Sequence, residues 1–126
     1  MPNRYIDVPL YRLAHSRTGD KGNISNISVI AFEPEYFRML AKQLTEAAVQ
    51  DWFAFRQPKS VHRYLIESIF SMNFVLDGIL DGGVNDALNL DAHGKALSFY
   101  LLDFPIRVSK ELSEKLPDLH DEVNII

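Results

Sequence analysis

The sequence predicts an α+β fold in which a four-stranded, mainly antiparallel sheet carries its helices on one face. Segments with the alternating pattern of strands and segments with the spacing of helices follow one another along the chain. The chain has 126 residues, which suits one domain, and 47% of them are hydrophobic, an ordinary share for a globular protein. Cysteine is absent, so the fold is held by its core without disulfides.

The first two strands are expected on either side of a polar loop. Residues 10–15 alternate between polar and apolar, and residues 24–32 do so again, with apolar side chains on one side and Asn26 and Ser28 on the other. A glycine-containing loop, residues 15–23, connects the two segments. We therefore expect an antiparallel pair whose connection is longer than a tight hairpin turn.

Two helices and a third strand are predicted next. Pro34 suits the first turn of a helix, and the apolar residues after it recur at helical spacing as far as Leu44. Thr45 is a good N-cap for a second, short helix. After a break at residues 57–60, the β-branched and aromatic side chains of residues 61–66 predict the third strand.

A helix, a strand and another helix are expected to complete the domain. Ser71 can cap a helix that ends at Gly82 and Gly83. Residues 84–90 favour a fourth strand, and Asp91 can cap the helix that follows. The resulting order, β-β-α-(α)-β-α-β-α, is that of a ferredoxin-like sandwich.

The end of the chain departs from this pattern. Residues 104–108 are expected to be extended, and residues 109–116 to form a charged helix that Pro117 ends. The chain ends on Val123, Asn124, Ile125 and Ile126, of which three are apolar. We therefore expect a domain over residues 1–108 and a charged and apolar tail over residues 109–126, which either docks on a neighbour or stays disordered.

Composition argues against several classes of function. The net charge is −4 and the pI is about 5.5, which speaks against a general nucleic-acid-binding surface. The first residues lack the apolar centre of a signal peptide, and no apolar run reaches the ~20 residues of a membrane span, so we expect a cytoplasmic protein. Without cysteine and without histidines at metal-motif spacing, we expect no metal and no cofactor.

Residues 15–23, HSRTGDKGN, form the densest group of polar and charged side chains in the chain. Arg17 can contact an anion with two N–H groups, and Lys21 can add a second positive charge. Gly19 and Gly22 let the backbone approach a ligand closely. The pattern favours an anion or carboxylate site, and its plainer interpretation is a solvated loop between two strands.

Five further side chains complete this candidate site. His15 and Asp20 are candidates for acid and base, because imidazole titrates near neutral pH. Ser16 and Asn23 are candidate ligand-binding residues of the same loop. Asn73 can direct its amide at a ligand from the start of the predicted helix, although helix capping explains it as well.

The string LAHSRTGDKGN at residues 13–23 resembles the C-terminal domain of the acyclic terpene utilisation protein AtuA. Further segments that fit this domain are residues 26–31, 49–53, 63–64, 72–77, 82–83 and 88–95. The resemblance covers the chain from about residue 8 to residue 108. It implies a ferredoxin-like fold and a link to the breakdown of branched terpenoid acids and their acyl-CoA esters.

In AtuA-like proteins this domain usually follows a larger N-terminal domain, and it also occurs as a separate small protein. The resemblance therefore implies a small subunit or standalone domain that binds a carboxylate or acyl-CoA ligand through residues 15–23. We expect it to assemble with itself or with a large AtuA-like subunit. The alternatives are a self-sufficient lyase, hydratase or isomerase that uses His15 and Asp20, and a purely structural assembly module.

Overall fold

A computed structural model describes residues 4–21, 24–78 and 96–116 of the chain. The strands are β1 (Tyr5–Pro9), β2 (Ala14–Lys21), β3 (Ile24–Ala31), β4 (Ser60–Ile66), β5 (Ser71–Asp77) and β6 (Pro105–Ser109). The α-helices are α1 (Pro34–Gln43), α2 (Glu46–Trp52), α4 (Ala96–Leu102) and α5 (Lys110–Lys115). Three short 3₁₀ turns are η1 (Leu10–Arg12), η2 (Ala54–Arg56) and η3 (Glu67–Ile69).

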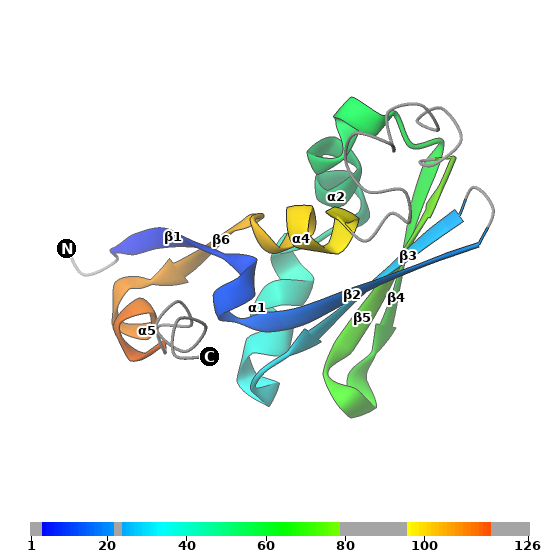
Figure 1. Cartoon of the computed structure of the whole chain (residues 1–126). Helices are drawn as coiled ribbons and strands as arrows, with labels where there is room; N and C mark the ends of the chain where they lie inside the picture. Colours follow the sequence, from blue (N-terminus) through cyan, green and yellow to red (C-terminus); the bar gives the residue numbers. More distant parts are fainter. Residues whose placement is uncertain (1–3, 22–23, 79–95, 117–126) are drawn as a thin grey trace, which may run out of the picture.

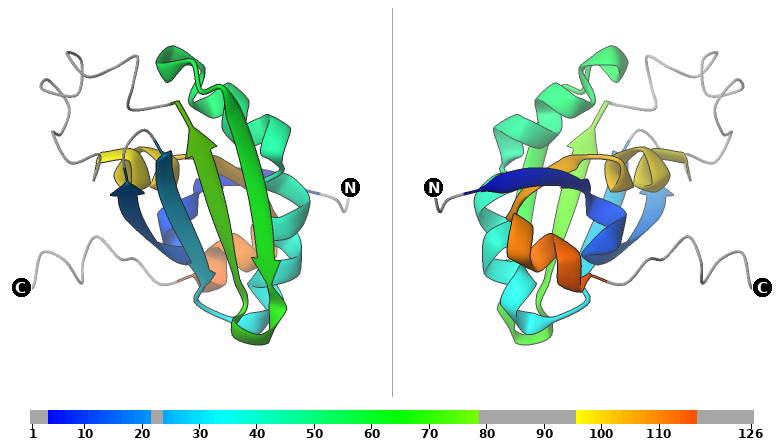
Figure 2. Two further views of the ribbon diagram at one scale, coloured as in Figure 1. Left: turned by 90° about the vertical axis from the view of Figure 1, so that its right-hand side faces the viewer. Right: turned by 90° about the vertical axis from the view of Figure 1, so that its left-hand side faces the viewer.

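The main sheet has four strands in the order β2-β3-β5-β4, and every neighbouring pair is antiparallel. Since β3 and β4 are both antiparallel to β5, they are parallel to each other, and the chain between them passes through α1 and α2. This is the split β-α-β unit of ferredoxin-like folds. The described helices lie behind one face of the sheet (Figure 1; Figure 2, left). The predicted α+β class is therefore confirmed.

A smaller, two-stranded sheet lies on the helical side of the molecule. β1 pairs antiparallel with β6 from Tyr5 opposite Ser109 to Pro9 opposite Pro105. Both strands contact α5, whose N-terminus is capped because the Ser109 hydroxyl accepts a hydrogen bond from the Leu112 amide. The extended segment and the charged helix predicted near the end of the chain are thus both confirmed.

The core lies between the inner face of the main sheet and the helices. Alternate residues of β3 and β5 point into it, and their neighbours face the other way. The buried apolar side chains of these two strands are Ile27, Val29, Ala31, Met72, Phe74 and Leu76. They pack in one cluster with residues of the helices and the small sheet, including Leu40, Leu44, Val49, Phe53, Leu97, Leu101, Ile106 and Val108.

Local sequence signals predict α1 and α2 correctly. α1 begins at Pro34, the position at which a missing amide proton costs nothing. The Thr45 side chain caps α2 by accepting a hydrogen bond of 3.1 Å from the Ala48 amide. β3 and β4 also form where the alternation and the β-branched content place them.

The expected strand at residues 10–15 is wrong. Leu10–Arg12 form a 3₁₀ turn, in which the Leu13 amide donates a hydrogen bond of 2.8 Å to the Leu10 carbonyl. Leu10 and Leu13 lie three residues apart and are both fully buried, which a 3₁₀ turn allows and strand alternation does not. The first strand of the main sheet begins only at Ala14.

The polar loop predicted at residues 15–23 is also wrong, because most of it is strand β2. Its backbone pairs with β3 from Ala14 opposite Ala31 to Lys21 opposite Ile24. Only Gly22 and Asn23 lie between the paired ends, so the connection is shorter than predicted. Ladder pairing with β3 outweighs the low strand propensity of the residues GDK.

The helix predicted from Ser71 is a strand, β5. The run SMNFVLD is apolar enough to suit either element, and it is the partners on both sides, β3 and β4, that select the extended form. Other predicted features lie outside the described residues: the ending at Gly82 and Gly83, the strand at residues 84–90, the cap at Asp91 and the segment after Leu116. Ala96–Leu102 are helical, as expected for the segment after that cap.

Arg63 connects the edge of the main sheet to the helices. Its side chain reaches the C-terminus of α1, where one guanidinium nitrogen donates to the carbonyls of Ala41 and Leu44 at 2.6 and 2.7 Å. Its backbone amide donates to the Glu46 carboxylate of α2 at 2.8 Å. A cation at the end of a helix satisfies carbonyl groups that have no partner within the helix.

We expect Arg63→Ala to lower the free energy of unfolding by about 2 kcal/mol, because it removes two charge-assisted hydrogen bonds in a half-buried place. Urea unfolding followed by circular dichroism measures the change. The control is His62→Ala, the exposed neighbour on the same strand, which should change stability by less than about 0.5 kcal/mol. Equal losses in the two variants would contradict this role for Arg63.

Candidate functional site

One face of the main sheet carries no helix among the described residues, and we call it the open face (Figure 2, left). It consists of the alternate strand residues that point away from the core. They are His15, Arg17 and Gly19 of β2, Ile24, Asn26, Ser28 and Ile30 of β3, Ser71, Asn73, Val75 and Asp77 of β5, and Ser60, His62, Tyr64 and Ile66 of β4. An antiparallel sheet commonly has one face on the core and the other toward water, and polar residues predominate on the open face.

The strand register aligns four polar side chains across the whole sheet, and we call them the polar row. Arg17 is opposite Ser28, Ser28 is opposite Asn73, and Asn73 is opposite Tyr64. Because neighbouring strands are about 4.8 Å apart, the row is roughly 14 Å long. It combines one cation with hydroxyl and amide groups, all of which can donate hydrogen bonds.

An amide pair lies in the middle of the open face. The Asn73 Nδ2 atom donates a hydrogen bond of 3.1 Å to Oδ1 of Asn26, which is diagonal to it on the neighbouring strand. This bond orients both side chains. It uses neither the Asn73 carbonyl oxygen, which is an acceptor, nor the Asn26 amide nitrogen, which is a donor.

Arg17 brings an unbalanced positive charge to this face. Its side chain is exposed and has no hydrogen bond or ion pair with any side chain that the structure describes. Asp77, an acidic residue of the open face, is opposite Ile24. It lies two strands away from Arg17, and four residues further along the sheet than the polar row. The surroundings of Arg17 therefore favour an anion.

Gly19 leaves a gap beside Arg17, opposite Asn26 in the strand register. A Cβ atom added there would meet no heavy atom of the described residues within 4 Å. A ligand group can therefore approach the backbone of β2 at this point, between the Arg17 and Asn26 side chains.

His15 lies two residues before Arg17 on β2 and so shares the open face. It is exposed, and its ring contacts Phe32 edge-on with 4.4 Å between the ring centroids. Within the described part of the chain, no carboxylate bonds to it. His15 can therefore contact a ligand held by Arg17, while nothing described here fixes which ring nitrogen carries the proton.

The family model of the AtuA ferredoxin-like domain matches residues 8–107. The chain belongs to this family. No curated protein and no solved structure matches it. The resemblance inferred from the sequence and the ferredoxin-like architecture is thus confirmed, and the match covers β2, β3, β4 and β5, the strands that form the open face.

The predicted site residues of this AtuA ferredoxin-like domain separate into two sets. His15, Arg17, Gly19 and Asn73 meet on the open face, but Asn73 does so from a strand and not from a helix N-terminus. Ser16 lies on the opposite side of β2, with a buried hydroxyl that bonds to no other described atom. Ser16 therefore lies apart from the four residues on the open face.

The rest of the predicted loop is described only in part. The backbones of Asp20 and Lys21 belong to β2 and are opposite Ser25 and Ile24, and Gly22 and Asn23 lie outside the described residues. The roles predicted for these four residues stay predictions.

Three further polar residues of the candidate site cannot be found from the sequence alone. Ser28 and Asn26 form the polar side of a predicted strand, yet nothing local shows that this side faces Arg17 and Asn73. Tyr64 has the same position on β4. A strand pattern reveals which residues share a side, but not which strands are neighbours.

The described residues were also compared with the requirements of a metal site and of a membrane-spanning helix. No three His, Asp or Glu side chains of this part of the chain gather as they would around a metal ion. None of the described helices is long and apolar enough to cross a membrane. Burial, followed by the nearby Glu33 and Glu35 carboxylates, raises the pKa of the Tyr36 phenol, so this group stays protonated at neutral pH.

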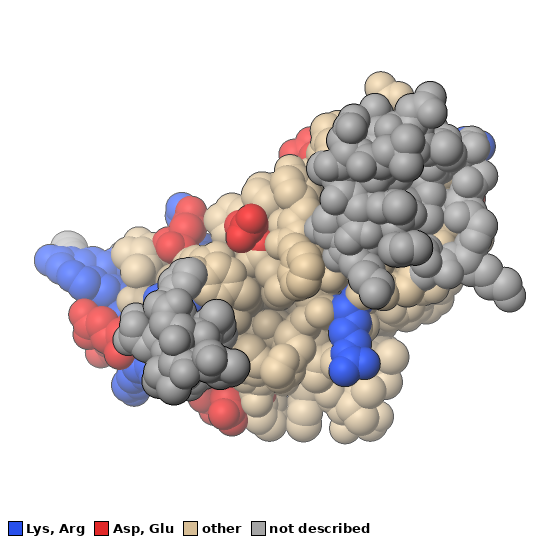
Figure 3. All heavy atoms as spheres, viewed as in Figure 1, with Lys and Arg blue, Asp and Glu red and all other residues tan. Residues whose placement is uncertain are grey.

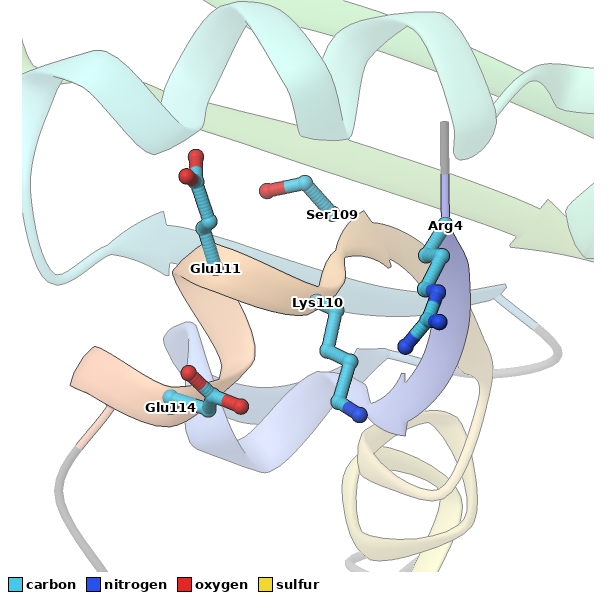
Figure 4. Close-up of a pocket in the computed structure, with 5 residues that line it drawn as sticks. All are labelled: Arg4, Ser109, Lys110, Glu111 and Glu114. Carbon is cyan, nitrogen blue, oxygen red and sulfur yellow. The ribbon is translucent and has the colours of Figure 1, made fainter. Parts of the chain in front are cut away.

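Two surface hollows lie away from the open face. One, of about 360 Å³, is lined by Arg4, Ser109, Lys110, Glu111 and Glu114. Figure 4 shows Glu111 projecting away from Lys110. The positive and negative side chains that line this hollow therefore do not converge on one point. The other, between α1 and the η3 turn, is largely apolar. Neither contains a predicted site residue.

A pair of glycine variants tests the gap at Gly19. Gly19→Ala should leave the free energy of unfolding unchanged or raise it by up to about 1 kcal/mol, because the added methyl meets no atom and alanine restricts the unfolded chain. Gly78→Ala should lower it by at least about 1 kcal/mol, because Gly78 has a φ of 81° and its Cβ would lie 2.8 Å from Lys59 Cγ. Urea unfolding of both variants measures the difference, and a clear loss of stability in Gly19→Ala would show that the gap is not open.

Proposed function

We propose that this domain binds an anionic group on the open face, either a carboxylate or the phosphate-bearing part of an acyl-CoA. The observation that carries the proposal is the polar row. In it Arg17, which pairs with no described side chain, is aligned with the neutral donors Ser28, Asn73 and Tyr64. Arg17 binds the anion with two N–H groups, and the gap at Gly19 admits it. The Asn26 amide adds a donor on the same side.

We further propose that the domain works as a small subunit, assembled with itself or with a large AtuA-like subunit. The exposure of Arg17 on the open face supports this, because an exposed side chain is surrounded by water. A contact between an anion and a fully hydrated arginine contributes only about 0–1 kcal/mol, which amounts to weak binding. A second surface that covers the open face excludes water and strengthens the contact.

The alternative, a lyase, hydratase or isomerase that acts alone, has one favourable observation. His15 shares the open face with Arg17, so an acid–base group lies near the proposed anion site. An exposed site leaves the substrate in water, whereas catalysis of this kind needs a site that excludes it. Turnover of acyl-CoA esters by the isolated chain, including unsaturated esters on which a hydratase or isomerase can act, distinguishes this alternative from a shared site.

Binding of acetyl-CoA to the ¹⁵N-labelled chain tests the anion site, since nuclear magnetic resonance detects weak binding residue by residue. We expect shifts at the amides of Arg17, Ser28 and Asn73, with a Kd in roughly the millimolar range. Butanoate, as a simple carboxylate, should shift the same amides more weakly. Arg17→Ala should remove the shifts caused by both compounds.

The matched control is Arg107→Ala, which removes another exposed strand arginine whose only described ion pair is a 3.4 Å contact to Asp7. It should leave the shifts unchanged. Shifts that persist in Arg17→Ala, or the absence of shifts in the wild-type chain, would show that the open face is not an anion site.

A further inference from the structure

The hollow between α1 and the η3 turn differs in character from the open face. It has a volume of about 320 Å³, and we call it the apolar hollow. Its lining residues are Pro34, Phe37, Arg38 and Ala41 of α1 and, on the other wall, Leu65, Glu67 and Phe70. Five of these seven side chains are apolar, so the hollow suits an apolar side chain from a neighbour.

A group of exposed apolar side chains borders the apolar hollow. Ile69 at the end of the η3 turn is 56% exposed, and Leu65 and Phe70 are each about 40% exposed. Neighbouring large apolar side chains on a surface normally mark a site of association. The chain thus presents a projecting apolar turn directly beside a hollow that such a turn can fill.

The turn is held in one conformation. Phe70 has a φ of 52°, in the left-handed region that a bulky side chain rarely adopts. Its amide donates to the Glu67 carbonyl at 3.1 Å, and its carbonyl accepts from the Ala31 amide at 3.0 Å. Because the backbone is fixed on both sides, Ile69 projects from a preformed ridge and little conformational freedom is lost on association.

The two walls of the apolar hollow carry one charge each, of opposite sign. Arg38 lies on α1 and Glu67 on the turn, and no ion pair of the described residues joins them. A surface with a cation on one side and an anion on the other complements a copy of itself that is rotated by 180°. A twofold axis between the hollow and the turn brings Glu67 of one copy to Arg38 of the other.

We propose that the partner at this surface is a second copy of the chain, with the turn of each copy inserted into the apolar hollow of the other. Ile69 enters the hollow, and two Glu67–Arg38 pairs form at its edges. The contact uses a different surface from the open face and does not rest on the proposed anion site. Its small extent corresponds to a dimer with a Kd of roughly 1–10 μM.

Sedimentation velocity at roughly 100 μM, above that Kd, tests the proposal. The wild-type chain should sediment as a dimer. Arg38→Glu and Glu67→Arg should each sediment as monomers, because like charges then meet twice across the axis. An equimolar mixture of the two variants should dimerise again, since the mixed dimer restores both pairs of opposite charge.

Substitution of the projecting side chain gives a second measurement. Ile69→Asp should weaken association more than 10-fold, because a carboxylate then enters an apolar hollow. Tyr5→Asp is the matched control, since Tyr5 is also 56% exposed but lies on β1. It should sediment like the wild-type chain. Circular dichroism and urea unfolding confirm that each variant is folded.

Several results would overturn the proposal. They are a monomeric wild-type chain at this concentration, a dimer that persists in Ile69→Asp, and a mixture of the two charge variants that stays monomeric. Failure of the dimer leaves the acetyl-CoA measurement on the open face unaffected, so the two proposals stand or fall separately.

Discussion

The pairing of β5 between β3 and β4 is the constraint on which the rest of the structure depends. All seven residues of β5 are paired on both sides, from Ser71 to Asp77. Met72, Phe74 and Leu76 on its inner side are fully buried in the centre of the core. Without β5 between them, β3 and β4 have no common partner. The two strands joined through α1 and α2 would then no longer belong to one sheet.

The same register determines the open face. Because side chains alternate along a strand, burial of Met72 and Phe74 requires that Asn73 point outward. Asn73 then meets Ser28 and Tyr64 across the ladders, and Arg17 follows through the β2–β3 pairing. A slip of one residue would bring the polar row into the core, so stability of the core and geometry of the candidate site depend on the same hydrogen bonds.

The molecule presents two chemically different surfaces beyond its core. The open face is polar and carries Arg17, which pairs with no side chain among the described residues. The apolar hollow is lined by aromatic and aliphatic side chains, with one charge on each wall. In the view of Figure 3, charges of both signs gather elsewhere, over the end formed by β1, β6 and α5. This separation allows ligand binding and self-association to be tested by different variants.

The sequence by itself determined the α+β class, the family, the helices α1, α2 and α5, the strands β3 and β4, and four residues of the open face. Local signals carry these elements: alternation along β3, the cap Thr45, Pro34 at a helix start and the charged run at residues 109–116. Only the tertiary structure decided that the polar segment after Ala14 and the apolar run after Ser71 are strands. Their backbone groups pair with residues distant in the sequence, which no local pattern reveals. The alignment of Arg17 with Ser28, Asn73 and Tyr64 arises from the same distant pairing.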